Sequence, residues 1–414
     1  MSVALELFKE SVKELDRQDP LAGFKSRFAL PEEMIYLDGN SLGAQPIASH
    51  QAVEGTLTQW RNELIKGWNQ GWFDAPERLG NLLAPLIGAH DDEVVVTDNI
   101  TLNIYKLIGY ITESQSRKRP VILSEGGNFP TDGYIAQGFC HFTGFEHRFI
   151  PVGGRVEDYL DDQVAVVILS HVHYRTGQVR DMAEITRKVH ACGAEIIWDL
   201  AHSAGALEVD LHTHDVRFAV GCTYKYLNGG PGAPGFLYVS KTHQDNAWQP
   251  LTGWHGHAAP FAFDGDYAPA SGMTRFRTGT HSALIYSALE ASLALWQEVN
   301  MADLRAKSLK MTELFRECIA DTLQRHSIED ITPPADERGS QVSLIDQQHG
   351  YAIVQALIER GVIGDYREPG LLRFGFTPLY LSYEDVWQAA RHFCEVVESG
   401  EYQAPRFQVR ASVT

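Results

Sequence analysis

The sequence has few cysteines, and they are widely spaced. The five are Cys140, Cys192, Cys222, Cys318 and Cys394, an odd number without a CxxC pair. Zinc sites and the disulfide frameworks of small secreted domains need cysteines in close pairs or in dense, even sets. The pattern therefore favours neither kind of site, and we expect a protein of the reducing cytoplasm.

Long apolar runs are missing as well. Residues 1–17 mix charged and apolar side chains, unlike the uninterrupted apolar stretch of a signal peptide. No later run reaches the roughly 20 residues that a membrane-spanning helix needs. The sequence also lacks biased tracts and internal repeats. We therefore expect a globular protein that does not associate with membranes.

Basic residues are outnumbered. The chain has 35 Lys and Arg against 53 Asp and Glu, a formal charge of −18, and the acidic residues are scattered along it. A surface of this charge disfavours nucleic acid and anionic membranes as partners. What the sequence does have is an ordinary globular composition, with 44% hydrophobic and 21% charged residues.

The length of 414 residues suggests two domains. Short apolar runs rich in β-branched residues recur between about residues 90 and 240, separated by turns and helix-like spacings. This alternation predicts an α/β fold with a mostly parallel sheet and helices on both faces. We expect the strands at 93–96, 120–123, 164–169, 195–198, 218–222 and 235–239.

Helical spacing is clearest in two places. The first face holds Met182, Ile185, Val189 and Cys192, and Gly193 stands where a C-terminal cap belongs. The second is in a long helix with one face at Leu304, Met311, Phe315 and Ile319. From 341 to about 397 a strand, a helix, further strands and a helix follow. We expect an N-terminal segment (1–50) packed with the small domain, a large domain (51–290) and a small α+β domain (291–414).

Polar residues follow the predicted strands directly. In open parallel sheets, ligands bind beyond the carboxyl ends of the strands. The hydroxyl-rich turn at 97–101 opens a helix whose free N–H groups would hold a phosphate. The other polar residues at these ends include Asn128, Asp132, Ser170, Asp199, His202, Tyr224 and Lys225.

Each of these residues has an ordinary structural explanation when taken alone. Thr101 and Asp199 suit helix caps, Phe129 suits the core, and Lys225 suits a solvated surface. Their joint occurrence at strand ends favours a functional site. Lys225 lies between two tyrosines in a glycine-rich setting, and a partly buried lysine can form a Schiff base. Because Asp199 could keep a pyridine nitrogen protonated, the pair suits pyridoxal phosphate.

The histidines offer a competing interpretation. His171 with His173, and His255 with His257, form two HxH pairs of the kind that bind metals. No third ligand motif with a metal-like spacing accompanies them, so we predict no metal site.

Six segments carry a resemblance to a known family. They are YLDGNSLG at 36–43, NFPTD at 128–132, DLAH at 199–202, YKYLN at 224–228, GWHGH at 253–257 and FRTGT at 276–280. In order and spacing they resemble the kynureninase family, from about residue 30 into the C-terminal domain. Such motifs are weak singly and specific together.

The resemblance implies a fold-type I pyridoxal-phosphate enzyme that works as a homodimer, with active sites at the subunit interface. Lys225 would form the internal aldimine, Asp199 would pair with the pyridine nitrogen, and Phe129 would stack on the ring. Further cofactor contacts are implied for Ile100, Thr101, Asp132, Ser170, His202 and Tyr224, and, in the site of the partner subunit, for Trp254 and Thr280.

The resemblance also implies a reaction, the hydrolytic cleavage of L-kynurenine to anthranilate and L-alanine in tryptophan catabolism. Lys225 would act as base and acid at the α-carbon, and Tyr224 is the expected acid at Cβ. Arg373 matches the arginine that binds the substrate's α-carboxylate, a role that suits its planar fork of donors. The other expected substrate contacts are Asn40, Ser41 and Trp68.

Two other functions remain open from the sequence. A cysteine desulfurase or an aminotransferase of the same fold class would share the cofactor. A desulfurase needs a reactive cysteine on a mobile loop and usually a histidine before the lysine, whereas Tyr224 precedes Lys225 here. A non-catalytic scaffold would have no need of Lys225, Asp199 and Arg373 together.

Trp68 and Thr280 bear on the choice of substrate. Animal members of the family that the chain resembles prefer 3-hydroxykynurenine and carry histidine and asparagine at the aligned positions. An apolar wall such as Trp68 lacks polar partners for a ring hydroxyl. We therefore expect a preference for L-kynurenine, with weaker action on 3-hydroxykynurenine. The alternative is that Trp68 only packs in the core and Thr280 only binds phosphate.

Overall fold

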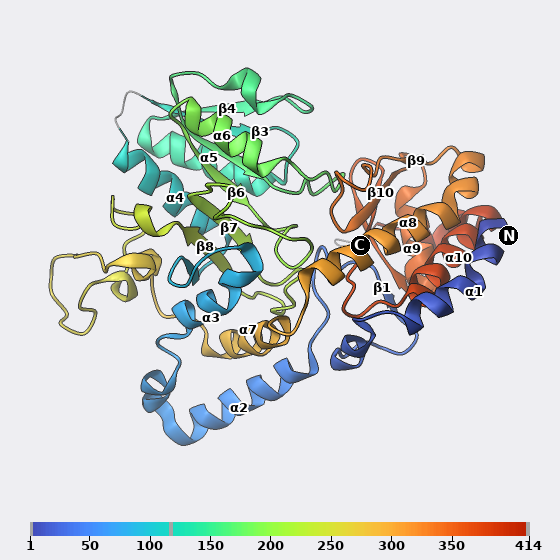
Figure 1. The fold of residues 1–414 in the computed structure, drawn as a ribbon, viewed down its shortest axis with the longest axis horizontal. Coiled ribbons are helices and arrows are strands. Elements are labelled where there is room, and N and C mark those ends of the chain that lie inside the picture. The colour runs from blue at the N-terminus through green and yellow to red at the C-terminus, as the bar shows by residue number, and fades with distance from the viewer. Residues whose placement is uncertain (1–2, 116–118, 411–414) are drawn as a thin grey trace.

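A seven-stranded sheet forms the centre of the larger part of the molecule (Figure 1). The structure is a computed structural model that describes residues 3–115 and 119–410. The strand order is β2-β8-β7-β6-β5-β3-β4; neighbours from β7 to β4 are parallel, and β8 is antiparallel to both of its neighbours. The bounds are β2 Val94–Val96, β3 Val121–Glu125, β4 Glu146–Ile150, β5 Val164–Ser170, β6 Glu195–Asp199, β7 Phe218–Cys222 and β8 Gly235–Val239.

Helices cover both faces of this sheet, as strand β5 shows. Val166 and Ile168 belong to one buried cluster, which α4 (Ile100–Ser114) and α5 (Pro130–Thr143) complete. The alternate residues Val167 and Leu169 belong to a second cluster, with α3 (Ala75–Leu83), α6 (Met182–Ala191) and α7 (Ala283–Trp296). Successive side chains of a strand point to opposite faces, so a fully buried strand needs a layer on each side. The predicted α/β fold class is confirmed.

The smaller part is built on an antiparallel sheet with the order β12-β13-β10-β9. Helix α1 (Val3–Arg17) lies along α10, where the Trp387 Nε1–H donates to the carbonyl of Leu5 at 2.8 Å (Figure 1). A short parallel pair, β1 with β11, joins the N-terminal segment to this part again. The bounds are β1 Ile35–Tyr36, α8 Met301–His326, β9 Glu329–Asp330, β10 Gln341–Ile345, α9 Gly350–Glu359, β11 Val362–Ile363, β12 Asp365–Arg367, β13 Leu371–Gly375 and α10 Tyr383–Ser399.

The elements expected from apolar patterns are present. All six predicted strands are found, and the predicted helices are α6, which ends just before Gly193 at φ +82°, and α8. Strand β4 was not predicted, because its residues EHRFI, on a sheet edge, form no apolar run. The expected domain boundary at residues 290 and 291 falls inside α7, and the division into domains stays a prediction.

A buried ion pair ties the N-terminal segment to α8. The Nζ of Lys307 lies 2.6 Å from Asp19, and the two side chains are only 4% and 2% exposed. We expect Asp19→Ala to lower the free energy of unfolding by about 3–5 kcal/mol, because it leaves a buried ammonium group without its carboxylate. Urea denaturation followed by circular dichroism checks this. The control is Glu10→Ala, which breaks an exposed pair with Lys13 and should cost less than about 1 kcal/mol. Equal losses for both variants would contradict the prediction.

Candidate active site

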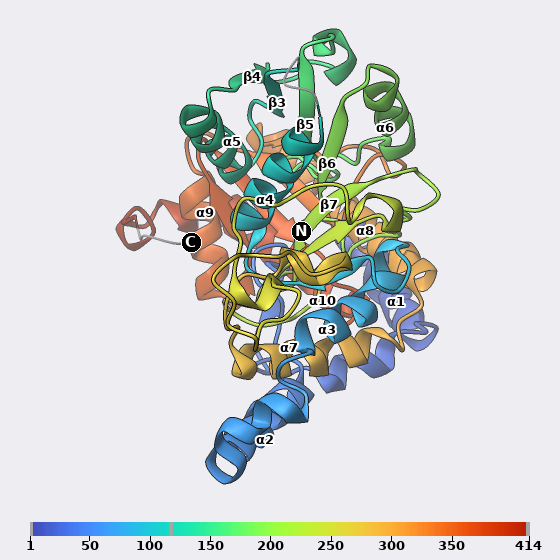
Figure 2. The same cartoon turned by 90° about the vertical axis from the view of Figure 1, so that its left-hand side faces the viewer.

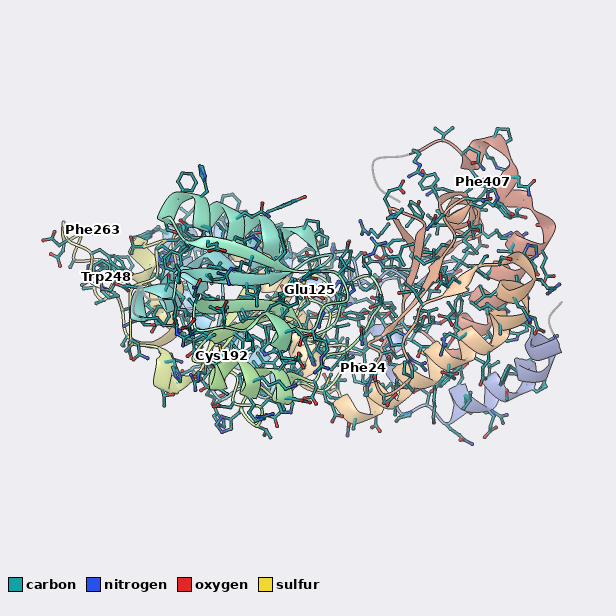
Figure 3. All side chains as sticks on the ribbon, turned by 90° about the horizontal axis from the view of Figure 1, so that it is seen from above. Phe24, Glu125, Cys192, Trp248, Phe263 and Phe407 are labelled. Carbon is teal, nitrogen blue, oxygen red and sulfur yellow. The ribbon has the colours of Figure 1, made fainter. Side chains whose placement is uncertain are left out.

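A cavity of about 380 Å³ opens at the carboxyl ends of the parallel strands. Figure 3 shows Glu125, the last residue of β3, on the side of the sheet that faces the smaller part of the molecule. The cavity brings together nine of the residues predicted from the sequence. They are Ile100, Thr101, Phe129, Asp132, Ser170, Asp199, His202, Tyr224 and Lys225.

The amine of Lys225 is in the middle of this group. Its Nζ lies 2.9 Å from the Nε2 of His202 and 6.0 Å from the ring centroids of both Phe129 and Tyr224. Burial, and then the charge of Lys225, lower the pKa of His202 well below its usual value. The imidazole is therefore neutral, and its Nε2 can accept a hydrogen bond from the Lys225 amine. Lys225 is therefore not a solvated surface charge.

Two buried carboxylates face the lysine. Burial raises the pKa of Asp199, although the neighbouring Lys225 favours its ionised form. Burial also raises the pKa of Asp132 well above its usual value, and the charge of Asp199 raises it further. Asn128 holds the second carboxylate, because its Nδ2 donates to Asp132 at 3.1 Å and to the Oγ of Ser170 at 2.8 Å. The pocket therefore buries more carboxylate than it has cation to balance.

The helix N-terminus at the cavity is that of α4. Asn99 is its cap, since the Asn99 side chain accepts a hydrogen bond from the backbone N–H of Leu102. The N–H groups of Ile100 and Thr101, in the first turn, have no acceptor within the helix and carry the positive end of its dipole. Thr101 is therefore free to bind a ligand rather than needed as the cap. This arrangement suits a phosphate.

Arg373 and Ser41 form a second group beside the cavity. The Arg373 Nε and Nη2 groups both donate to the carboxylate of Asp365, and Nη2 also donates to the Oγ of Ser41 at 3.2 Å. Arg373 Nη1 donates to the carbonyl of Tyr174 at 2.8 Å, and Tyr174 lines the cavity. Asn40 is buried nearby against Gly375, the last residue of the arginine's strand β13.

Trp68, Trp254 and Thr280 lie outside the cavity of their own chain. The ring of Trp68 makes edge contacts with His255 and His281, at centroid distances of 6.3 and 5.5 Å. Trp254 is 42% exposed, and Thr280 lines a separate hollow of about 240 Å³. Within one chain, the structure does not bring these three residues to Lys225.

Comparisons with known proteins decide the family. The chain is 48% identical to the kynureninase of Burkholderia mallei (strain SAVP1) over 98% of its own length and 99% of the relative's. The chain belongs to the kynureninase family. It is also 46% identical to the kynureninase of Pseudomonas fluorescens over 97% of its length and 98% of that protein, and residues 304–393 match the kynureninase C-terminal domain.

Solved structures of the same fold are more distant. The cysteine desulfurase CsdA of Escherichia coli superimposes with a TM-score of 0.76 at 18% identity, covering 91% of this chain and 98% of its own. A C-DES variant with glycine covalently linked to its pyridoxal-phosphate cofactor gives a TM-score of 0.78 at 21% identity, covering 90% and 99%. These likenesses show the fold-type I architecture.

The cysteines of this chain also differ from what a desulfurase needs. A desulfurase cysteine has to be mobile and accessible, whereas Cys318 and Cys394 are buried in α8 and α10. Burial raises the pKa of both thiols, to about 12 for Cys318 and about 11 for Cys394. Neither thiol can therefore supply a ready thiolate. The assignment to the kynureninase family and the chemistry of these cysteines agree.

Sequence reasoning gave no role to three residues of the site. Tyr174 packs edge-on against Phe129 at 5.5 Å and accepts a hydrogen bond from Arg373. Asn128 joins Asp132 to Ser170, and Asp365 binds Arg373. Asn128 belongs to a quoted motif, so its place next to Phe129 was a usable signal. Nothing in the local sequence marks Asp365.

Proposed function

We propose that this protein is a pyridoxal-phosphate-dependent kynureninase that hydrolyses L-kynurenine to anthranilate and L-alanine. Membership of the kynureninase family supports the reaction. The observation that carries the proposal in the structure is the common cavity of Lys225, the neutral His202 and two buried carboxylates. An enzyme of this family needs an amine that exchanges its covalent partner, and a partly buried lysine beside a hydrogen-bond acceptor provides it.

The residues of the cavity fit the cofactor. Asp132 and Asp199 are both buried, and among the described residues Lys225 is the cation whose charge acts on both. A protonated pyridine nitrogen beside Asp199 would supply the missing positive charge. The Nδ1 of His202 is buried without a hydrogen-bond partner among the described residues, so it is available to form a hydrogen bond with a polar ligand.

Each part of the cofactor has residues that would hold it. The N–H groups of Ile100 and Thr101 would bind the phosphate at the N-terminus of α4. Lys225 would hold the cofactor covalently, Asp199 would bind its pyridine nitrogen, and Phe129 would stack on its ring. When bound, pyridoxal phosphate supplies an electron-withdrawing ring that stabilises negative charge on the carbon atoms next to the substrate amine.

The protein's own groups then move the protons. Lys225 Nζ would take the proton from the substrate α-carbon, and the neutral His202 Nε2 at 2.9 Å would hold the lysine in place. Burial raises the pKa of Tyr224, and the neighbouring Cys222 and Asp199 raise it further. Because its hydroxyl stays protonated, Tyr224 would donate the proton to Cβ. Arg373, with Asn40 and Ser41, would bind the α-carboxylate.

We also propose that the enzyme is a homodimer with active sites at the interface. Helix α2 (Ile47–Glu63) projects from the body (Figure 2), and the following Leu64 and Ile65 are 63% and 77% exposed. Exposed apolar side chains on a projection favour a partner surface, and a second copy of the chain is the partner proposed. Such a dimer would let Trp254 and Thr280 reach the partner's cavity.

The covalent role of Lys225 can be tested directly. We expect borohydride to fix the cofactor on the peptide that contains Lys225, and Lys225→Ala to lose both this label and the release of fluorescent anthranilate from L-kynurenine. Lys241→Ala, which changes an exposed lysine, is the control and should keep both. Peptide mapping that finds the label on another lysine, such as the buried Lys106, would overturn the assignment.

Asp199→Asn tests the pairing with the pyridine nitrogen. The variant should still bind the cofactor, but turnover should fall by several orders of magnitude, because a neutral amide does not stabilise a protonated pyridine. Cofactor absorbance and steady-state kcat measure the two effects. Asp181→Asn is the matched control, since Asp181 caps α6 and asparagine caps a helix equally well. Near-normal turnover of Asp199→Asn would rule out this role.

The substrate preference is also testable. Trp68 is half-buried in a cluster of rings with Trp72, His255 and His281, so an aromatic face is available to a substrate ring in the partner's site. We expect kcat/KM to be higher for L-kynurenine than for 3-hydroxykynurenine, and Trp68→His to shift the ratio towards the hydroxylated substrate. Trp60→His, at an exposed tryptophan of α2, should leave the ratio unchanged. A wild-type preference for 3-hydroxykynurenine would refute the hypothesis.

A further inference from the structure

The charges around Arg373 are only partly balanced before any substrate arrives. Asp365 is 1% exposed and binds two arginines, Arg373 through Nε at 2.8 Å and Arg367 through Nε at 2.9 Å. Burial by itself would raise the pKa of Asp365, but the hydrogen bond and charge of Arg373 lower it more. Asp365 is therefore ionised, and this group of three carries one net positive charge.

Most of the donors of Arg373 are already occupied. A guanidinium has five N–H groups, and four hydrogen bonds of Arg373 go to Asp365, Ser41 and Tyr174. Because few of these donors are free, binding of an incoming α-carboxylate depends on the net charge of the groups around Arg373. The single positive charge left by the two arginines and Asp365 is what attracts it.

A fourth ionisable group decides whether that positive charge is available. Asp38 follows β1 and pairs with Gly375 at the end of β13, and its Oδ1 is buried without a hydrogen-bond partner in the described part of the chain. Burial, and then the charge of Asp365, raise the pKa of Asp38 to about 7, against the lowering effects of Ser41 and the arginines. The titratable and charged groups that face Asp38 are Tyr36 on β1, Tyr226 after β7, Asp365 and Arg367 on β12, and Arg373 on β13.

A second observation points to a ligand at the same place. Asn40, two residues after Asp38, is 1% exposed, and neither atom of its amide has a hydrogen-bond partner among the described residues. A buried amide without partners is costly in a protein alone. A polar ligand that forms hydrogen bonds with the Asn40 amide would explain why this amide is buried.

We propose that Asp38 has to be protonated for the substrate's α-carboxylate to bind beside Arg373. An ionised Asp38 would cancel the one net positive charge and add a repelling carboxylate next to the incoming one. A neutral Asp38 keeps the charge. The inference rests on the proposed role of Arg373 in binding the α-carboxylate, and it makes Asp38 a positioning residue that sets the affinity of the site without touching the reacting carbon atoms.

The pH dependence follows with a definite sign. Asp38 is neutral below its pKa and ionised above it, so free enzyme competent to bind substrate is lost as pH rises through about 7. Well above that pKa, kcat/KM should fall about tenfold per pH unit because of this group. The kcat value should be unaffected, because the bound enzyme already carries the proton.

The experiment compares wild type with Asp38→Asn, in holoenzyme with L-kynurenine, between pH 6.0 and 8.5. Other groups titrate in both proteins, so we divide the kcat/KM of wild type by that of Asp38→Asn, and this ratio isolates the effect of Asp38. We expect this ratio to be constant near pH 6 and to fall at least tenfold by pH 8.5, while the ratio of kcat values stays flat. A constant kcat/KM ratio, or a change confined to kcat, overturns the proposal.

Two controls make the result specific. Asp92→Asn makes the same chemical change at a side chain that is 70% exposed, and its kcat/KM ratio to wild type should not change with pH. Arg373→Ala should raise KM at every pH, and an unchanged KM would contradict the proposed function of Arg373. If KM rises but the ratio of wild type to Asp38→Asn does not change with pH, only the inference about Asp38 is wrong. If Asp38→Asn does not fold by circular dichroism, Asp38→Ser takes its place with the same expected ratio.

Discussion

Charge buried at the carboxyl ends of parallel strands is the constraint on which the larger part of the molecule depends. Strands β5 and β6 end in Ser170 and Asp199, which are 4% and 5% exposed, and helices shut water out of both sheet faces. A carboxylate in such a place is unstable unless something cationic or hydrogen-bonding meets it. The charges of Asp132 and Asp199 are offset by Lys225, by the Asn128 amide and by the proposed pyridinium. Binding of the cofactor would therefore also stabilise the site.

The smaller part of the molecule also buries a carboxylate, but there arginines balance its charge. The buried Asp365 is held between Arg367 and Arg373 on adjacent strands β12 and β13, and the N-terminal segment adds Asp38 and Ser41 to the same group. The N-terminal segment thus does more than pack against α10. It supplies the carboxylate that we propose controls substrate binding, and it also contacts the lysine loop, because the backbone N–H of Gly43 donates to the carbonyl of Tyr224 at 2.8 Å.

The strand-end half of the site could be predicted from the sequence, because the fold rule and the residue order coincide there. Once the apolar runs at 164–169, 195–198 and 218–222 are taken as parallel strands, the polar residues after them have to converge. The rest could not be predicted in this way. Ser41 and Asp365 are 324 residues apart and meet through β1, β11 and β12, whose short strands have weak patterns. Edge strand β4 is half-exposed and polar, so it too lacked a signal.

The fold by itself does not choose the reaction. At 18–21% identity the desulfurase structures share the sheet, and function is a property of sites placed on a fold. In this chain Cys318 and Cys394 are buried and their thiol pKa values are raised, so neither supplies the thiolate nucleophile that a desulfurase needs. What surrounds the cavity instead is an arginine group fitted to a carboxylate and, in the proposed dimer, an aromatic cluster around Trp68 fitted to a ring. A substrate that carries an α-carboxylate at one end and an aromatic ring at the other satisfies both, as kynurenine does. The choice of substrate therefore lies in segments outside the central sheet, which approach the cavity from the smaller part of the molecule and, in the proposed dimer, from the second subunit.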